Sequence, residues 1–412
     1  MKNIRNRALK LGAGTVIAQL ISILSVPLIT RMYGPQEYGH LTLFLSTASI
    51  LIPLATLRIE SRLVVTENPE IAGTMLREAF KIAFVFCVFV NVLTFIYFLI
   101  ASSYDLLKCL ISSILFTLVL FGQALGIVFV QVALRVKLDA NISQSSVIQN
   151  FSTAAAQMLF GFWNPVGNLL ISGFIAGRFL GYISLLAEVK RLYMFGKKQK
   201  QNLIELYQKQ LALNKSLISA SFIDTSILGL PTILIGSKFG VEYAGYIGIT
   251  QTLLMVPITL IAGAFGSVII SELANRSTTS DSLVQQNRAL LSYIGKKLMI
   301  AALIFTLFTG LAGPKIFLIA LGSSWETAST LISVLALPFA VTLVWQPLMN
   351  VYLAQRLYDI YLRISITRIV VAVTIAGLFM ALNFSWIAVI CGFFYGNMFV
   401  QIKNLIDLYK QS

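Results

Sequence analysis

Residues 31–40 read RMYGPQEYGH, and residues 237–246 read SKFGVEYAGY. In each stretch an aromatic residue precedes a glycine, a Glu-Tyr pair begins two or three positions later, and a second glycine lies five positions after the first. Each stretch follows an apolar run that contains a proline, Pro27 or Pro231, and each opens another apolar run. A similar motif, here called a corner because it joins two apolar runs, thus occurs twice, about two hundred residues apart. The repeat predicts a chain made of two similar halves.

The composition is that of a membrane protein. Of the 412 residues, 57% are hydrophobic and 11% are charged, and the mean hydropathy is +0.84. A soluble domain carries about 25% charged residues, more than twice this share. Uncharged runs of about 20 residues, the length that a helix needs to cross the hydrocarbon core, recur along the whole chain. The sequence therefore predicts an all-α polytopic membrane protein.

Twelve transmembrane helices are expected, and the basic residues orient them. The spans are 11–30, 41–57, 82–101, 109–134, 141–160, 166–186, 217–236, 246–270, 298–313, 327–351, 364–382 and 387–401. The first span is long enough to be retained rather than removed as a signal peptide. With both termini inside, 26 of the 31 Lys and Arg fall in inner segments and four in outer loops. Such asymmetry marks cytoplasmic termini, and it explains the net charge of +15 without a nucleic-acid partner.

The longest break in hydropathy divides the chain into an N-terminal six-helix lobe (1–186), a basic cytoplasmic linker (187–216) and a C-terminal six-helix lobe (217–412). The linker suits the inner leaflet, where anionic lipid attracts basic segments, and an ordinary solvated connector is the alternative. Because the two similar corners both lie outside, the lobes are expected to be parallel repeats. Parallel repeats are typical of alternating-access transporters, whereas a duplicated inert scaffold is the alternative.

Catalytic and metal sites are not expected. Cys87, Cys109 and Cys391 fall singly inside apolar runs, without the spacing of a metal site or a disulfide framework. His40 is the only histidine, which argues against a His-based catalytic triad and a His-rich metal site.

Two charged residues lie inside expected spans. Arg178 and Asp224 would each cost roughly 2.5–3.5 kcal/mol at the bilayer centre, so each should face a cavity or a partner. They lie at matched depths, about 10–12 Å from the inner surface at 1.5 Å per residue. Either they form a salt bridge between the halves, or they act separately, Arg178 on an anionic group of the substrate and Asp224 on a coupling cation.

Uncharged polar residues also recur within the spans. One span carries a polar seam that repeats every four residues, and another carries the pair Gln346 and Asn350. The seam comprises Asn141, Ser145, Gln149, Thr153 and Gln157. These residues either line a wet cavity or join helices by hydrogen bonds, as small and polar residues do in membranes.

Four stretches occur in a characteristic order. They are AQLISILSVPLITRMYGPQEYGHLTLF (18–44), LRIESRLVV (57–65), LPTILIGSKFGVEYAGYIGITQTLLMVPITLIAGAFGSVIISELA (230–274) and LGSSWETASTLISVLALPF (321–339). Together they resemble the bacterial polysaccharide repeat-unit (O-antigen) flippases of the multidrug/oligosaccharidyl-lipid/polysaccharide exporter superfamily. The second stretch departs from that family's Leu-Arg-Tyr-Glu pattern, because Ile59 replaces the tyrosine.

This resemblance implies a V of two six-helix lobes around a central cavity, as in multidrug exporters of the MATE type. It implies a protein of the bacterial cytoplasmic (inner) membrane that carries undecaprenyl-pyrophosphate-linked oligosaccharide, with membrane lipids, a polysaccharide polymerase and chain-length regulators as further partners. Arg31, Arg58 and Glu60 match motif positions. Asp224 is the candidate for coupling to H⁺ or Na⁺, and no other cofactor is implied.

From these residues we expect Arg178 and Arg58 to attract the pyrophosphate. Arg31, Gln157, Gln346 and Asn350 are the further candidate substrate-binding residues. A multidrug antiporter of the same superfamily is the nearest alternative, although it favours cations and hence buried acids. A polysaccharide polymerase or glycosyltransferase is disfavoured, because the outer segments are too short for a catalytic domain.

Overall fold

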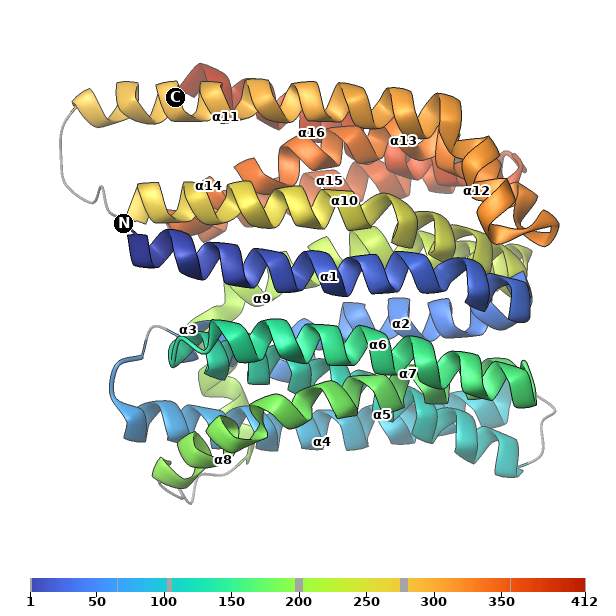
Figure 1. Cartoon of the computed structure of the whole chain (residues 1–412), viewed down its shortest axis with the longest axis horizontal. Coiled ribbons are helices and arrows are strands. Elements are labelled where there is room, and N and C mark those ends of the chain that lie inside the picture. The colour runs from blue at the N-terminus through green and yellow to red at the C-terminus, as the bar shows by residue number, and fades with distance from the viewer. Residues whose placement is uncertain are drawn as a thin grey trace. The chain divides into compact units, whose positions relative to one another are not determined.

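The computed structural model describes residues 2–64, 66–101, 106–196, 203–274, 281–355 and 357–411, and the regular elements in these ranges are all helices. The helices form two compact units, Met1–Ile233 and Leu234–Ser412 (Figure 1). Helices satisfy every backbone hydrogen bond within one segment, which is why long apolar runs adopt this structure in lipid.

The first unit is a bundle of long helices. Its members are α1 (Lys2–Met32), α2 (Pro35–Thr56), α3 (Ile59–Leu63), α4 (Pro69–Ala101), α5 (Leu106–Arg135), α6 (Asp139–Trp163), α7 (Gly167–Tyr182), η1 (Ile183–Leu185), α8 (Leu186–Phe195) and most of α9 (Leu203–Phe239). Helix α6 packs against both α1 and α7, and α5 packs against α2, α4 and α7. One apolar core surrounds Tyr33 near the start of α2, and a second surrounds Leu57 beyond its end.

The second unit is organised around α13. It contains the end of α9, α10 (Val241–Ala274), α11 (Asp281–Leu307), a π-helical turn at Phe308–Ala312, α12 (Gly313–Leu321), η3 (Ser323–Trp325), α13 (Glu326–Leu348), α14 (Asn350–Ala354), α15 (Tyr358–Ala381) and α16 (Trp386–Gln411). Helix α13 packs against α10, α11, α12 and α16, and α15 packs against α16.

Within the described ranges, eleven helices are long and apolar enough to cross a membrane, so the protein is a multi-pass membrane protein. The remaining span expected from the sequence, 141–160, corresponds to α6, which has 25 residues but is not among these eleven. Its polar seam is the physical reason, because amide and hydroxyl side chains lower its hydropathy. The count of twelve spans therefore stays a prediction at α6.

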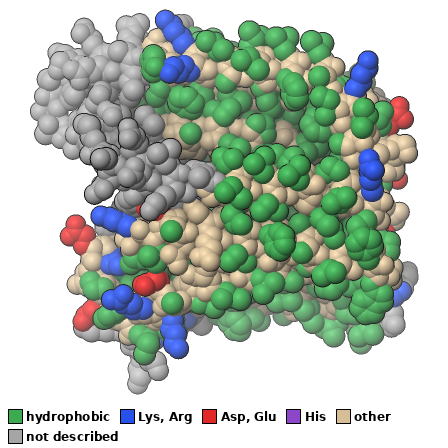
Figure 2. Space-filling view, viewed as in Figure 1, with side chains coloured by type: hydrophobic (Ala, Val, Ile, Leu, Met, Phe, Trp, Pro, Cys, Tyr) green, Lys and Arg blue, Asp and Glu red, His purple; other side chains and the backbone are tan. Residues whose placement is uncertain are grey.

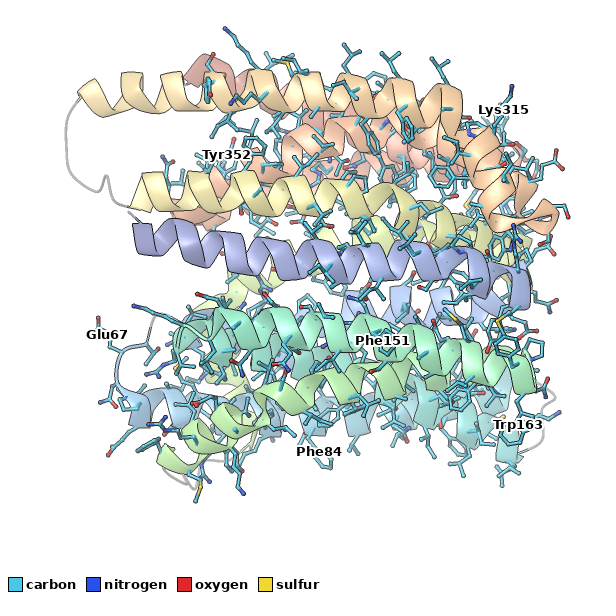
Figure 3. The ribbon with its side chains drawn as sticks, viewed as in Figure 1. Glu67, Phe84, Phe151, Trp163, Lys315 and Tyr352 are labelled. Carbon is cyan, nitrogen blue, oxygen red and sulfur yellow. The ribbon has the colours of Figure 1, made fainter. Side chains whose placement is uncertain are left out.

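Side chains follow the pattern expected of such a protein. On the face shown in Figure 2, hydrophobic side chains cover the middle of the helices, while charged side chains gather toward the helix ends. Phe84 projects outward from α4 and is 59% exposed (Figure 3). Glu67 and Trp163 mark the two ends of the first unit in the same view.

The segment between the expected lobes is largely helical where the structure describes it. Helix α8 occupies Leu186–Phe195, and α9 begins at Leu203, fourteen residues before the expected start of the seventh span at position 217. The early start follows from burial of one face of α9, on which Leu206 and Ile218 join the apolar core of the first unit. The boundary between the compact units falls after Ile233. The lobe boundaries given above remain a prediction.

The two similar corners begin α2 and α10, and each contacts later helices of its own unit. In the first corner, the Glu37 carboxylate accepts a hydrogen bond from the backbone N–H of Gly167, where α7 begins. In the second, the Tyr243 ring lies 4.9 Å from the ring of Trp386, where α16 begins. Similar sequences thus connect the first corner of each unit to a later helix start, by different chemistry.

Candidate functional site

A polar cavity of about 360 Å³ lies within the first unit, among α2, α5, α6 and α7. Its polar lining consists of Gln123, Gln131, Ser145, Ser146, Gln149, Arg178 and Tyr182. Among the lining residues that the structure describes, only Arg178 is charged. The cavity therefore offers one fixed positive charge surrounded by amides and hydroxyls.

Arg178 is held by contacts on both sides of its guanidinium. One terminal nitrogen donates a hydrogen bond to Oε1 of Gln149 over 2.9 Å, and the guanidinium carbon lies 4.9 Å from the centre of the Phe174 ring. A cation over an aromatic face gains electrostatic attraction, and more so away from water. Arg178 thus lines a cavity, which is one of the two surroundings expected for a charged residue inside a span.

The polar seam of α6 lies against a row of glycines on α7. A Cβ on Gly181, Gly177 or Gly173 would come within 2.8 Å of atoms of Gln149, Thr153 or Gln157, respectively. Small residues of this kind let membrane helices approach closely. The seam therefore joins the two helices, and only its part near Ser145 and Gln149 also lines the cavity.

Gln157 belongs to the packed part of the seam. It is 5% exposed, and its amide donates to the carbonyl of Leu170 over 3.2 Å. This contact favours the helix-joining alternative for Gln157, and substrate binding by this residue stays an untested prediction.

Tyr182 and Gln123 complete the polar wall. The Tyr182 hydroxyl donates to the carbonyl of Gly122 over 2.7 Å, and a Cβ on Gly126 would lie only 2.2 Å from that hydroxyl. The Gln123 amide nitrogen is buried and has no hydrogen-bond partner among the described residues. Because an unsatisfied buried donor costs about 1–3 kcal/mol, this group favours a ligand or water oxygen in the cavity.

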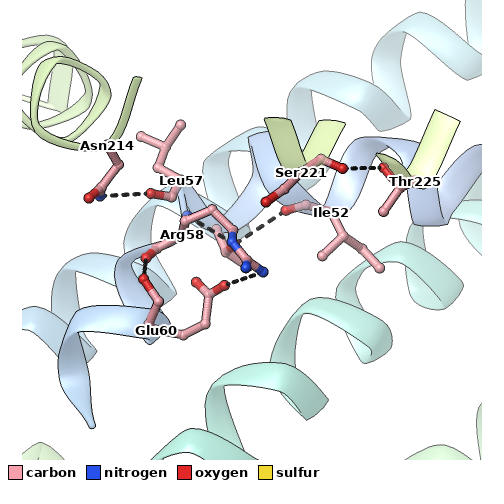
Figure 4. Close-up of polar contacts among 9 residues, drawn as sticks. Ile52, Leu57, Arg58, Glu60, Asn214, Ser221 and Thr225 are labelled. Carbon is pink, nitrogen blue, oxygen red and sulfur yellow. Dashed lines mark hydrogen bonds and ion pairs between the residues drawn. The ribbon is translucent and has the colours of Figure 1, made fainter. Parts of the chain in front are cut away.

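A second polar cluster surrounds Arg58, between α2 and α3 (Figure 4). Leu57 and Arg58 both have left-handed backbone conformations, with φ of 47° and 54°. Arg58 lies 3.5 Å from Oε1 of Glu60, and the side chains are 31% and 1% exposed. An arginine at a helix break thus shields a carboxylate that is almost fully buried.

Burial raises the pKa of Glu60 above its ordinary value, while the Arg58 charge and hydrogen bonds from its own backbone and from Thr56 oppose this shift. The Arg58 Nε atom and the Glu60 Oε2 atom have no hydrogen-bond partner among the described residues. The hydrogen-bonding capacity of Arg58 and Glu60 is therefore only partly used.

The other predicted residues are dispersed. Arg31 is exposed at the end of α1, and Asp224 is half-buried in the part of α9 that belongs to the first unit. The Arg178 guanidinium contacts Gln149 rather than Asp224 among the described residues, which favours separate roles. In the second unit, the Asn350 amide donates to the Pro347 carbonyl over 3.1 Å, and the buried Gln346 Oε1 has no partner in the described part of the chain.

Gln210 and Asn214 are polar residues that we did not single out from the sequence. Both are buried on the early part of α9 and bond to the first unit. The sequence could have indicated them, because they lie four and eight residues after Leu206 and therefore on the same face of the helix.

Comparison with known proteins agrees with these features. Residues 28–330 match the family described as "Polysaccharide biosynthesis protein". The chain belongs to this family. No curated protein matches it.

Solved structures show which fold this family member has. The lipid II flippase MurJ, in an inward closed conformation, is similar with a TM-score of 0.69 and 13% identity, covering 97% of this chain and 87% of that one. An inward-facing multidrug resistance MATE family transporter of the MOP superfamily gives 0.62 and 14%, covering 98% and 95%. A point mutant of the Vibrio cholerae MATE transporter VcmN gives 0.63 and 9%, covering 99% and 96%. The family member therefore has the fold of MOP superfamily transporters.

Proposed function

We propose that the protein is an alternating-access flippase that moves undecaprenyl-pyrophosphate-linked oligosaccharide repeat units, of an O-antigen or a related surface polysaccharide, from the inner to the outer leaflet of the bacterial cytoplasmic membrane. The polysaccharide biosynthesis family and the likeness to MurJ support this proposal. The observation that carries it is the cavity in the first unit, whose only charged lining residue among those described is Arg178.

The chemistry of this cavity suits such a substrate. Pyrophosphate and sugars cannot cross hydrocarbon unaided, because their polar groups lose water without replacement. An arginine presents a planar fork of donors that matches phosphate oxygens. The amides of Gln123, Gln131 and Gln149 can donate to sugar hydroxyls and accept from them. The polyprenyl tail stays in lipid throughout.

The proposed transport cycle uses the finer architecture expected from the sequence. This architecture comprises twelve spans including α6, a V of two six-helix lobes, and cytoplasmic termini. Arg58 meets the pyrophosphate at the inner mouth, and Arg178 receives it in the cavity. Arg31, Gln157, Gln346 and Asn350 remain further candidates for substrate contact.

Asp224 is the proposed coupling site for H⁺ or Na⁺. An ion that enters down about 100 mV supplies roughly 2.3 kcal/mol per charge. A polysaccharide polymerase and chain-length regulators are the proposed downstream partners, because they would act on the translocated repeat unit.

A multidrug antiporter of the same superfamily is less well supported. An antiporter of amphipathic cations favours buried acids, whereas the described lining of the cavity carries a single arginine and no acid. Drug resistance on overexpression, without any change in surface polysaccharide, would favour the antiporter.

The first test is made in cells depleted of the protein. The measurement is the face of the cytoplasmic membrane on which undecaprenyl-pyrophosphate-linked oligosaccharide accumulates. We expect build-up on the inner face, relieved by re-expression of the wild-type chain. Build-up on the outer face would mean that translocation is intact and would move the protein to a later step of polymer assembly.

A further inference from the structure

The early part of α9 packs against the rest of the first unit through one face of the helix. This face comprises Leu206, Gln210, Asn214 and Ile218, which are each at most 7% exposed. Residues four apart lie on the same side of a helix. Leu206 and Ile218 join the apolar core that contains Leu57, and the two polar residues lie between them.

Both polar side chains of this face are hydrogen-bonded. The Gln210 amide accepts from Arg62 over 3.3 Å and donates to Glu78 over 2.9 Å. The Asn214 amide donates to the backbone carbonyl of Leu57 over 3.0 Å (Figure 4). Asn214 therefore reaches Leu57, the residue directly after the end of α2.

The backbone at this point is strained. Leu57 and Arg58 are both in the left-handed region, and neither is a glycine. This conformation is unfavourable for residues other than glycine, and it persists only where the surroundings enforce it. Local support comes from the Thr56 hydroxyl, which accepts from the Arg58 N–H over 3.3 Å, and from Ser61, whose hydroxyl donates to the Arg58 carbonyl over 2.7 Å. Asn214 supplies the support from another helix.

The two left-handed residues are also what separates α2 from α3. Thr56 is helical and Ile59 is helical, so right-handed conformations at Leu57 and Arg58 would join both helices into one. Such a change would turn the Arg58 side chain away from its place beside Glu60. The direction in which Arg58 points thus depends on whether this break is maintained.

We propose that Asn214 is a positioning residue for Arg58, and that its hydrogen bond to the Leu57 carbonyl maintains the left-handed break that presents Arg58. The importance of this for transport rests on the proposed function, in which Arg58 meets the pyrophosphate at the inner mouth. The placement of Arg58 itself does not depend on that function.

The first experiment measures the position of residue 58 without reference to transport. In a chain with Cys87, Cys109 and Cys391 replaced by alanine, Arg58→Cys is labelled with a membrane-impermeant maleimide in inside-out vesicles. We expect Asn214→Leu, which removes the donor at similar volume, to change the labelling rate. Gln210→Leu is the matched control on the same helix face and should leave the rate unchanged. Equal rates in all three backgrounds would overturn the proposal.

The second experiment uses export of surface polysaccharide at matched membrane levels of the protein. Loss of one buried hydrogen bond, worth about 1–1.4 kcal/mol, should reduce the export rate of Asn214→Leu roughly fivefold to tenfold. Adding Leu57→Gly should restore part of this loss, because glycine adopts φ > 0 without strain. Leu57→Ala removes the same buried side chain without relieving strain and should not restore export. Equal behaviour of the glycine and alanine variants would contradict the inference.

Failure of this inference can be told from failure of the proposed function. If Arg58→Gln abolishes export while Asn214→Leu exports normally, only the positioning role is lost. If depletion causes no inner-face build-up of lipid-linked oligosaccharide, the flippase itself is wrong, and the labelling experiment still decides whether Asn214 positions residue 58.

Discussion

The Arg178 guanidinium on α7 donates to Oε1 of Gln149 on α6 over 2.9 Å, at the wall of a cavity within the first unit. A guanidinium has five N–H donors, so this bond leaves others for an anion. The glutamine fixes the direction in which the guanidinium points and leaves its charge in place, whereas a carboxylate would neutralise it. This arrangement suits a site that binds and releases an anionic group.

Arg178→Gln should therefore reduce export of surface polysaccharide by at least roughly tenfold, because hydrogen bonds to charged groups contribute about 1.5–3 kcal/mol each. Arg178→Lys should retain intermediate activity, since lysine keeps the charge but lacks the planar fork. The measurement is export per molecule of membrane-inserted protein. Wild-type export by Arg178→Gln would remove this residue from the mechanism.

The variant Gln157→Leu distinguishes a role of Gln157 in helix packing from a role in substrate binding. The Gln157 amide donates to the Leu170 carbonyl, which lies inside α7, so the variant loses one hydrogen bond between helices and should lower the free energy of unfolding by about 0.5–1.5 kcal/mol. Thermal unfolding in detergent measures this change. Export per folded molecule should stay near the wild-type level, with Arg178→Gln as the contrasting variant. A stable Gln157→Leu protein without export would instead place Gln157 in the substrate path.

The sequence predicts much of this fold because apolar runs and their flanking charges are local signals. Helix α6 shows the limit of such signals. Its seam at Gln149, Thr153 and Gln157 has one spacing, yet it serves both a cavity and a helix contact. The glycines of α7 decide between the two, and their alignment with the seam exists only after folding.

The break at Leu57 and Arg58 was beyond sequence reasoning for another reason. Left-handed conformations are expected at glycine or asparagine, and neither occurs at these positions. The conformation depends on support from Asn214, which lies 157 residues further along the chain. No local pattern reports a contact of that kind.

Glu60 should make the stability of the protein depend on pH. Burial raises its pKa in the folded chain above the ordinary value of 4.5. Between these two pKa values the folded chain holds a proton that the unfolded chain does not, so lowering the pH through this interval should stabilise the fold. Below the ordinary value both states are protonated, and Glu60 should contribute no further change.

The measurement is the melting temperature in detergent as a function of pH, for the wild type and for Glu60→Gln. The wild type should gain stability relative to Glu60→Gln as the pH falls, because glutamine cannot titrate. Other titratable groups act on both proteins and cancel in the difference. If the wild type instead loses stability relative to Glu60→Gln as the pH falls, the Arg58 charge outweighs burial at this carboxyl.

The two corners that first suggested a repeat should respond differently to the same substitution. Gly240 has φ of +125°, a conformation that side chains other than glycine rarely adopt. Gly34 has φ of −70° and ψ of 171°, and a Cβ there would meet no atom within 4 Å. Gly240→Ala should therefore lower the free energy of unfolding by more than about 1 kcal/mol, whereas Gly34→Ala should change it by less than about 0.5 kcal/mol.

Thermal unfolding of both variants tests this difference, and each serves as the control for the other. Because the sequences of the corners are similar, a repeat with identical geometry would give equal losses. Equal losses would contradict the different backbone conformations of the two glycines. Unequal losses would mean that the second corner keeps its glycine for backbone geometry, while the first is secured by Pro35 at the start of α2 and by the bond from the Gly167 N–H to Glu37.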